Sequence, residues 1–221
     1  MPESKPPKKL KHATLERLMH YYHYIGEQIA QQDMGTVSSS EIAKLLDTDD
    51  TVVRKDMAAI GVRGYPRVGF KADEVLAAIR DVLGFDNAYR AIIIGAGRLG
   101  SALASYPGFS RYGLRIDALL DSDPSRAGAI EGGVEVRPLT ELESIIAEHN
   151  VGLAILTVPA EAAQPLADRM VKSGLRAIWN FAPTSLVVPH GVLVRHEHIS
   201  VGLAELAYHL NRRDSENPPG E

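Results

Sequence analysis

The sequence predicts an α/β protein with two parts, a small helical N-terminal domain and a doubly wound parallel sheet. Residues 13–84 have helical periodicity with short polar breaks, whereas residues 85–200 alternate apolar runs with helical segments, which is typical of βαβ units. The composition changes at Gly84-Phe85-Asp86-Asn87, where we place the boundary. Strands are expected near residues 91–94, 116–120, 153–158, 176–179 and 192–194.

Composition excludes several classes of protein. The 221 residues include no cysteine, so disulfides, thiolate catalysis and cysteine-ligated metal sites are excluded. No apolar run approaches the roughly 20 residues of a membrane span, and the polar N-terminus lacks the apolar stretch of a signal peptide. We therefore expect a cytoplasmic protein without a membrane partner. The net charge of −4 argues against indiscriminate binding of nucleic acid.

The first domain, residues 13–84, has the pattern of a winged helix-turn-helix. A long amphipathic helix is expected over residues 14–31, and Ser38-Ser39-Ser40-Glu41 forms a capping box before a short helix. Asp49 then begins a second short helix that Gly61 ends. The glycine-punctuated, basic segment from Gly61 to Phe70 indicates a β-hairpin wing, followed by a helix over residues 71–83. Residues 1–12 and 212–221 are expected to be disordered tails.

The second short helix and the wing carry a local excess of positive charge. Such a helix enters the major groove of DNA, and Arg54 and Lys55 would contact a base edge and a phosphate. The acidic Asp49 and Asp50 precede them, which suits the helix dipole but not a phosphate. A module that docks a protein partner is the alternative. We expect DNA contacts from Ser38, Thr51, Arg54, Lys55, Arg63, Arg67 and Lys71.

The second domain, residues 85–200, begins with a dinucleotide-binding motif. The apolar run Ile92-Ile93-Ile94 leads directly into Gly95-Ala96-Gly97-Arg98-Leu99-Gly100 and a helical segment. In this motif Gly95 permits a tight turn, Gly97 a close approach to the pyrophosphate, and Gly100 close packing of helix on sheet. Arg98 is either a pyrophosphate ligand or a solvated helix charge. A glycine-rich turn that binds no ligand is the alternative to the whole motif.

An aspartate follows the motif at the distance that suits a ribose ligand. Asp121 ends the next predicted strand and would accept hydrogen bonds from the ribose hydroxyls. With Asp123 it would repel a 2′-phosphate, which favours NAD(H) over NADP(H), although Arg126 lies close in sequence. Together these residues predict a Rossmann-type NAD(H) domain.

Other strand ends supply the remainder of the expected pocket, because the carboxyl ends of parallel strands share one crevice. They are Thr157, Val158 and Pro159 at the end of the third strand and Asn180, Phe181, Ala182 and Pro183 at the end of the fourth. A hydride-transfer enzyme also needs a proton donor near the reacting carbon, and we find no suitable histidine with a partner arginine. An enzyme is therefore not expected. Nor is a metal site, since His196 and His198 are expected to point to opposite faces of a strand.

Several motifs together resemble the Rex family of redox-sensing transcriptional repressors. They are Val52-Val53-Arg54-Lys55-Asp56, the glycine motif continuing to Leu103, Tyr106-Pro107-Gly108-Phe109, Leu156-Thr157-Val158-Pro159 and Asn180-Phe181-Ala182-Pro183. The resemblance extends from about Thr14 to Leu210.

The resemblance implies a homodimer that binds a palindromic DNA operator and leaves it when NADH binds, with NAD⁺ leaving the DNA-competent form in place. It also implies that residues 201–211 form a helix exchanged between subunits, through Leu203, Leu206, Ala207 and Tyr208. Tyr106 would lie near the nicotinamide and register its redox state.

The sequence departs from the family pattern in two places. Arg67 stands in the wing where a glycine is expected, which predicts a changed operator sequence or affinity. His23 and His198 stand where the family commonly has an arginine and an aspartate of the redox relay. Two histidines cannot form that salt bridge at pH 7, and we hypothesise a pH-sensitive relay in its place. A dinucleotide-binding relative that has lost operator binding, and an NAD-dependent oxidoreductase, are the alternative functions.

Overall fold

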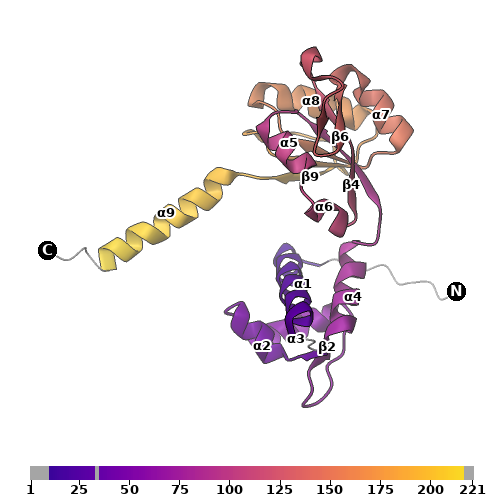
Figure 1. Cartoon of the computed structure of the whole chain (residues 1–221). Helices are drawn as coiled ribbons and strands as arrows, with labels where there is room; N and C mark the ends of the chain where they lie inside the picture. Colours follow the sequence, from indigo (N-terminus) through magenta and orange to yellow (C-terminus); the bar gives the residue numbers. More distant parts are fainter. Residues whose placement is uncertain (1–9, 33–34, 217–221) are drawn as a thin grey trace. The chain divides into compact units, whose positions relative to one another are not determined.

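The computed structural model describes residues 10–32 and 35–216, which divide into two compact units between Asn87 and Ala88 (Figure 1). Parts of the two predicted tails, residues 1–9 and 217–221, lie outside the described ranges. Residues 12 and 212–216 belong to helices instead of tails. Within the described part of the chain, no helix is long and apolar enough to cross a membrane.

The described residues of the N-terminal unit form four helices and a two-stranded antiparallel sheet. Its elements are α1 (His12–Gln32), β1 (Thr36–Val37), α2 (Ser39–Leu45), α3 (Asp50–Ala59), β2 (Phe70–Lys71) and α4 (Ala72–Leu83). Helix α1 packs against α4, and α2 packs against α3. Their inner faces share a core that includes Leu18, Tyr21, Ile25, Ile42, Val53, Met57, Val75 and Ile79.

Helices α2 and α3 begin where the sequence predicts. The hydroxyl of Ser38 accepts the backbone N–H of Glu41 at 3.1 Å, and the Glu41 carboxylate accepts the N–H of Ser38 at 2.7 Å. This capping box stabilises the start of α2 and holds the pKa of Glu41 below its ordinary value. Asp49 caps α3 by accepting the N–H of Thr51 at 2.7 Å.

The wing differs from the predicted hairpin. A single antiparallel bridge, between Tyr65 and Gly69, closes the loop. Strand β2 pairs with β1, from the other side of the helix-turn-helix, and not with the first half of the wing. A Cβ atom on Gly69 would lie 2.4 Å from the carbonyl oxygen of Val37, so the glycine permits this close pairing. A two-residue strand has too little alternation to specify its partner from sequence.

The C-terminal unit contains a seven-stranded sheet in the order β5-β6-β4-β3-β7-β8-β9. The strands are β3 (Tyr89–Ile94), β4 (Leu114–Asp121), β5 (Ile130–Glu131), β6 (Val134–Pro138), β7 (Leu153–Leu156), β8 (Ala177–Asn180) and β9 (Leu193–His196). All neighbours are parallel apart from β5 and β6. The chain winds away from β3 in both directions, which is the Rossmann arrangement with its ligand crevice at the carboxyl end of β3.

Helices cover both faces of the sheet (Figure 1). They are α5 (Arg98–Ala104), α6 (Gly108–Arg111), α7 (Leu142–His149) and α8 (Ala160–Lys172), with 3-10 turns at Pro124–Arg126 and Leu139–Glu141. Successive residues of β3 serve opposite faces: Ile92 and Ile94 pack with α7 and α8, whereas Ile93 packs with Phe109 of α6. The five predicted strands are present, but β5, β6 and α6 were missed because they are short and interrupted by charged or glycine residues.

The chain described here ends with α9 (Ile199–Glu216), which is longer than the helix predicted at residues 201–211. Every side chain from Val201 to Arg212 is exposed within the single chain, including Leu203, Leu206 and Tyr208. Apolar side chains in this number seldom remain in water on an isolated helix, so α9 lacks a partner surface in the monomer.

Candidate dinucleotide and DNA sites

The glycine motif forms a close-packed turn between β3 and α5. Gly95 has a φ of +102°, and a Cβ atom there would lie 2.7 Å from the carbonyl oxygen of Thr157. A Cβ atom on Gly100 would lie 1.9 Å from the carbonyl oxygen of Gly95, so α5 can approach the turn only with glycine at this position. At Gly97 the corresponding position has no atom within 4 Å, which leaves room for a ligand beside the backbone.

Two polar side chains fix this turn to the neighbouring strands. Asp121, at the end of β4, accepts the N–H of Ala96 at 2.6 Å and the N–H of Asp123 at 2.9 Å. The hydroxyl of Thr157, after β7, lies 2.9 Å from the carbonyl oxygen of Gly95 and donates to it. Because β4 and β7 flank β3, these bonds join the three central strands at the crevice. Each Asp121 oxygen keeps acceptor capacity for a further donor.

A cavity of about 390 Å³ opens at this point, and a site of this size suits a small molecule or cofactor. Of the predicted cofactor residues, Gly95, Gly97, Asp121, Thr157, Val158 and Pro159 line it. Ser122 also lines it, next to Asp121. Leu139, Ala162, Pro165 and Leu166 line it too, and sequence reasoning missed these four because α8 and the turn before α7 carry no binding motif. Ala96 is buried, and the side chain of Leu99 is exposed.

The turn after β8 does not line the cavity, and Asn180 has an internal role there. Its side chain is fully buried and accepts the N–H of Ala182 at 3.0 Å. Its amide nitrogen donates to the carbonyl oxygen of Thr184 at 2.7 Å and lies 3.0 Å from Nδ1 of His196. These bonds fix the conformation of the turn that contains Phe181 and Pro183, so the role of Asn180 is to stabilise this turn.

A chain of aromatic rings connects the predicted redox-sensing tyrosine to the end of β8. Tyr106 is about half exposed and lies edge-on to Phe109, with ring centroids 5.1 Å apart. Phe109 lies 6.1 Å from Trp179, which in turn lies 5.1 Å from Phe181. The Trp179 indole donates to Glu197 at 3.1 Å, next to the predicted relay residue His198. Sequence reasoning missed Trp179 because its neighbours become adjacent only through strand pairing.

The predicted relay histidines lie in different units. His23 is exposed on α1, where its ring meets Tyr22 edge-on with centroids 6.2 Å apart. His198 follows β9, and its ring stacks on His196 at 5.8 Å with planes 11° apart. The expectation that His196 and His198 point to opposite faces was therefore wrong, because residues two apart along an extended chain share a face. Within the described residues, no group of three or more metal-ligating side chains occurs.

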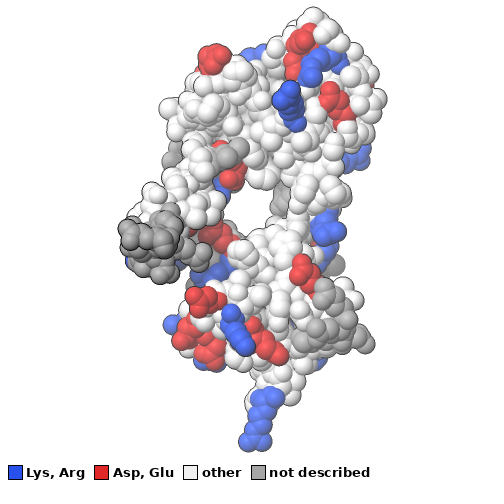
Figure 2. Space-filling model, turned by 60° about the vertical axis from the view of Figure 1, so that its left-hand side comes forward, with Lys and Arg blue, Asp and Glu red and all other residues white. Residues whose placement is uncertain are grey.

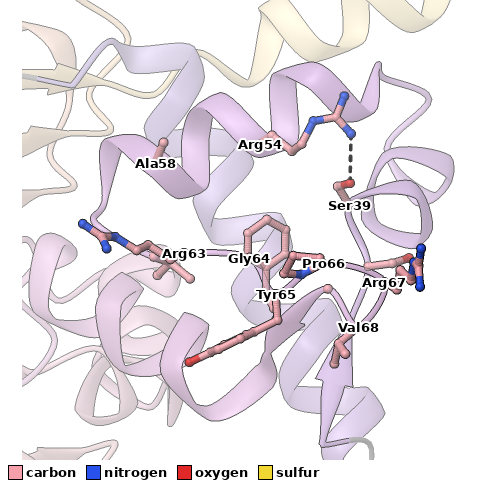
Figure 3. Close-up of a pocket in the computed structure, with 13 residues that line it drawn as sticks. Ser39, Arg54, Ala58, Arg63, Gly64, Tyr65, Pro66, Arg67 and Val68 are labelled. Atoms are coloured by element: carbon pink, nitrogen blue, oxygen red, sulfur yellow. Dashed lines mark hydrogen bonds between the residues drawn. The ribbon is translucent and has the colours of Figure 1, made fainter.

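The N-terminal unit has a groove of about 750 Å³ between α3 and the wing (Figure 3). Of the predicted DNA contacts, Ser38, Arg54, Arg63 and Arg67 line it. Thr51, Lys55 and Lys71 are exposed outside its lining. Figure 2 shows basic side chains on the protruding loop at the lower end of the molecule, and acidic side chains on the surface above them.

Helix α3 is clamped to α1 through a buried carboxylate that sequence reasoning did not assign to any site. Asp56 accepts hydrogen bonds from Nε and Nη2 of Arg17, at 2.7 and 2.9 Å, and from the hydroxyl of Tyr21 at 3.0 Å. Burial, together with this bond to a carboxylate, raises the pKa of Tyr21 well above its ordinary value. The clamp fixes the rotation of α3, so that Arg54 and Lys55 are on its exposed side.

The tip of the wing is a tight turn over Tyr65-Pro66-Arg67-Val68. The N–H of Val68 donates to the carbonyl oxygen of Tyr65 at 3.1 Å, and Arg67 has a φ of +64°. The left-handed region favours glycine, which agrees with the glycine that we expected at this position. Lys71 lies over the Tyr65 ring at 5.4 Å and pairs with Glu74 at 2.8 Å, which raises the pKa of Lys71.

Comparisons with known proteins match both units. Residues 9–58 match the family described as a putative DNA-binding protein N-terminus, and residues 86–184 match the CoA binding domain family. The chain is 35% identical to the redox-sensing transcriptional repressor Rex of Clostridium beijerinckii, over 94% of this chain and 98% of that protein. It is 40% identical to Rex of Syntrophomonas wolfei, over 91% of this chain and 96% of that protein. This chain belongs to the Rex family.

Solved structures of the Rex family have the same fold. RSP, a Rex-family repressor, matches with a TM-score of 0.84 at 33% identity, over 94% of this chain and 96% of RSP. RSP in complex with β-NAD⁺ and operator DNA matches with a TM-score of 0.87 over 94% of this chain and 95% of that one. RSP with β-NADH matches with a TM-score of 0.84. The predicted order, a winged helix-turn-helix followed by a Rossmann-type sheet, is therefore confirmed.

Proposed function

We propose that this chain is a cytoplasmic, homodimeric repressor that binds a palindromic DNA operator and leaves it when NADH binds. RSP, a Rex-family repressor, has been crystallised with NAD⁺ and operator DNA and with NADH. One observation supports the proposal for this chain: the same chain has a basic groove beside α3 and, later in the sequence, a Rossmann cavity next to the close-packed turn of Gly95, Gly100 and Thr157.

In this proposal NAD⁺ and NADH are regulatory ligands held by the cavity below the glycine turn. The backbone of Gly95 to Gly100 receives the pyrophosphate, and Asp121 accepts the ribose hydroxyls while its bonds to Ala96 and Asp123 hold it in place. Tyr106, Val158, Pro159 and the loop Asn180-Phe181-Ala182-Pro183 complete the nicotinamide end.

Dimerisation would cover the exposed apolar face of α9. In the C-terminal unit, a shallow groove of about 310 Å³ lies over β7, β8 and β9 and is lined by Leu153, Trp179 and Leu193, among others. We assign this groove to α9 of a second copy, with Leu203, Leu206, Ala207 and Tyr208 at the interface. Burial of the two leucines contributes roughly 1.5–3 kcal/mol each.

The regulation is a coupling between two binding equilibria. NADH must bind the DNA-free form more tightly than the DNA-bound form, and DNA must then weaken NADH binding by the same factor. A coupling of about 1–3 kcal/mol gives a switch of about 5–150-fold. We propose that Tyr106, His23 and His198 take part in this coupling. If His23→Ala and His198→Ala leave NADH-driven release unchanged at both pH 6 and pH 8, that role is wrong.

The test uses a fluorescent palindromic duplex, recovered by selection from a random library with the purified chain. We expect nanomolar-range binding by fluorescence anisotropy. Added NADH should release the duplex at fixed salt, and NAD⁺ should not. NADH binding with no selectable duplex would instead indicate a relative that has lost its operator. Turnover of a nicotinamide substrate would indicate an oxidoreductase.

A further inference from the structure

The guanidinium of Arg54 is already occupied in the chain on its own. Its Nη2 donates to Oδ1 of Asp50 at 2.9 Å and to the hydroxyl of Thr51 at 3.2 Å. Its Nη1 donates to the other oxygen of Asp50 and to the hydroxyl of Ser39, at 3.4 Å for the latter. Figure 3 shows the bond between Arg54 and Ser39, both of which line the groove. All four terminal N–H bonds therefore have partners within the protein.

The pairing matters because the same edge of an arginine is used to read DNA. The two terminal nitrogens form a fork that fits a pair of acceptors, either the O6 and N7 atoms of guanine or two phosphate oxygens. The Asp50 carboxylate presents such a pair to Arg54 from one helical turn away. It thus takes the place that the DNA acceptors would fill.

The carboxylate of Asp50 is not required for the start of α3. The neighbouring Asp49 provides the cap, through its bond to the N–H of Thr51. The ion pair is also open to solvent, with 52% of the Arg54 side chain and 39% of the Asp50 side chain exposed. Exposed pairs of this kind are weak, so DNA can displace Asp50 at a moderate cost.

We propose that Asp50 is an internal competitor for Arg54 that lowers the affinity of the recognition helix for DNA. This inference rests on the proposed function. Operator binding must break the ion pair between Asp50 and Arg54 in each subunit. The freed Asp50 carboxylate then lies near the DNA phosphates, whose negative charge repels it. The chain therefore binds DNA only where the new partners of Arg54 compensate for both effects. Asp50 therefore raises the concentration of this chain that is needed to occupy the operator.

The test compares two isosteric variants that remove one negative charge from adjacent positions. Asp50→Asn removes the carboxylate that holds Arg54, whereas Asp49→Asn keeps a good helix cap and leaves the pair intact. We expect Asp50→Asn to tighten binding of the selected palindromic duplex by roughly fourfold, from two weak pairs per dimer. Asp49→Asn should give a smaller gain. In the Arg54→Ala background the two substitutions should change duplex affinity equally, because the Asp50 carboxylate then has no arginine to pair with.

A second measurement requires no DNA. In the ¹⁵N-labelled full chain, the Nη signals of Arg54 should show more restricted motion in wild type and Asp49→Asn than in Asp50→Asn, where only the bonds to Thr51 and Ser39 remain. Unchanged Arg54 signals in Asp50→Asn would overturn the inference. The inference would also be overturned if Asp50→Asn bound the duplex no more tightly than Asp49→Asn, while the wild-type chain still bound the duplex and released it with NADH. If neither the wild-type chain nor any variant bound a duplex, the proposed function itself would be wrong. That result differs from the one that overturns only the role of Asp50.

Discussion

The dinucleotide cavity lies beside the turn from β3 into α5 and the DNA groove lies between α3 and the wing, and the two sites differ in the part of the residue that forms them. At the cavity, the close contacts belong to backbone atoms of Gly95 and Gly100 and to the Thr157 carbonyl. At the groove, the long side chains of Arg54 and Arg67 supply the charged part of the lining. Backbone geometry tolerates almost no substitution, whereas a side chain can be redirected by any neighbour with the right charge. The two sites should therefore respond differently to mutation.

The largest expected effect is at the glycine turn. Gly100→Ala places a methyl group 1.9 Å from a backbone oxygen that cannot move aside. We expect it to destabilise the C-terminal unit by about 3 kcal/mol, and to abolish NADH binding. The matched variant Gly97→Ala meets no protein atom within 4 Å and should fold normally. Thermal unfolding and NADH fluorescence titration measure both, and equal stability losses would contradict the geometry.

The clamp between α1 and α3 tests the other side of the comparison. Asp56→Ala leaves Arg17 and Tyr21 without their acceptor and should destabilise the N-terminal unit by about 3 kcal/mol. NADH binding should be unchanged, since the cavity belongs to the other unit. Denaturant unfolding followed by far-UV circular dichroism, with NADH titration in parallel, separates the two effects. Loss of NADH affinity with a stable N-terminal unit would count against this division.

Asp121 is the position where a side chain matters at the cavity. Asp121→Asn should weaken NADH binding by about tenfold, because it removes a charged acceptor for the ribose hydroxyls. It should also narrow the preference for NADH over NADPH, since less negative charge faces the 2′-phosphate. Fluorescence titration with both dinucleotides checks the result. Ser122→Ala, at the neighbouring lining position, is the control and should preserve the preference.

The smallest effect is expected at the tip of the wing. Arg67→Gly relieves a left-handed backbone at φ +64° and should stabilise the N-terminal unit by up to about 1 kcal/mol. It should weaken operator binding at the same time, because a cation is lost from the groove. Arg63→Gly, where the backbone is not left-handed, should weaken binding without stabilising the fold. If Arg67→Gly raises the stability of the N-terminal unit and lowers operator affinity, the charge of Arg67 matters for DNA binding although its backbone conformation is strained. Lower stability in Arg67→Gly would contradict the strain.

Much of the fold could be predicted, because its signals are local. The apolar run of β3 with the glycine motif, the capping box of Ser38 and Glu41, and the alternation of strands and helices all depend on residues close in sequence. The short elements could not be predicted. Strands β5 and β6 and helix α6 lack the length for a periodic pattern, and β2 pairs with β1 from the other side of the helix-turn-helix.

The sequence by itself determined the order of the two domains, the Rossmann turn and the basic character of α3 and the wing. Only the tertiary structure decided which side chains are available at these sites. It places Asn180 inside a loop, joins Tyr106 to Glu197 through Phe109 and Trp179, and clamps Asp56 to Arg17. The physical reason is that periodicity and glycine spacing act over a few residues, whereas hydrogen bonds and ring contacts form wherever folding brings partners within a few ångströms.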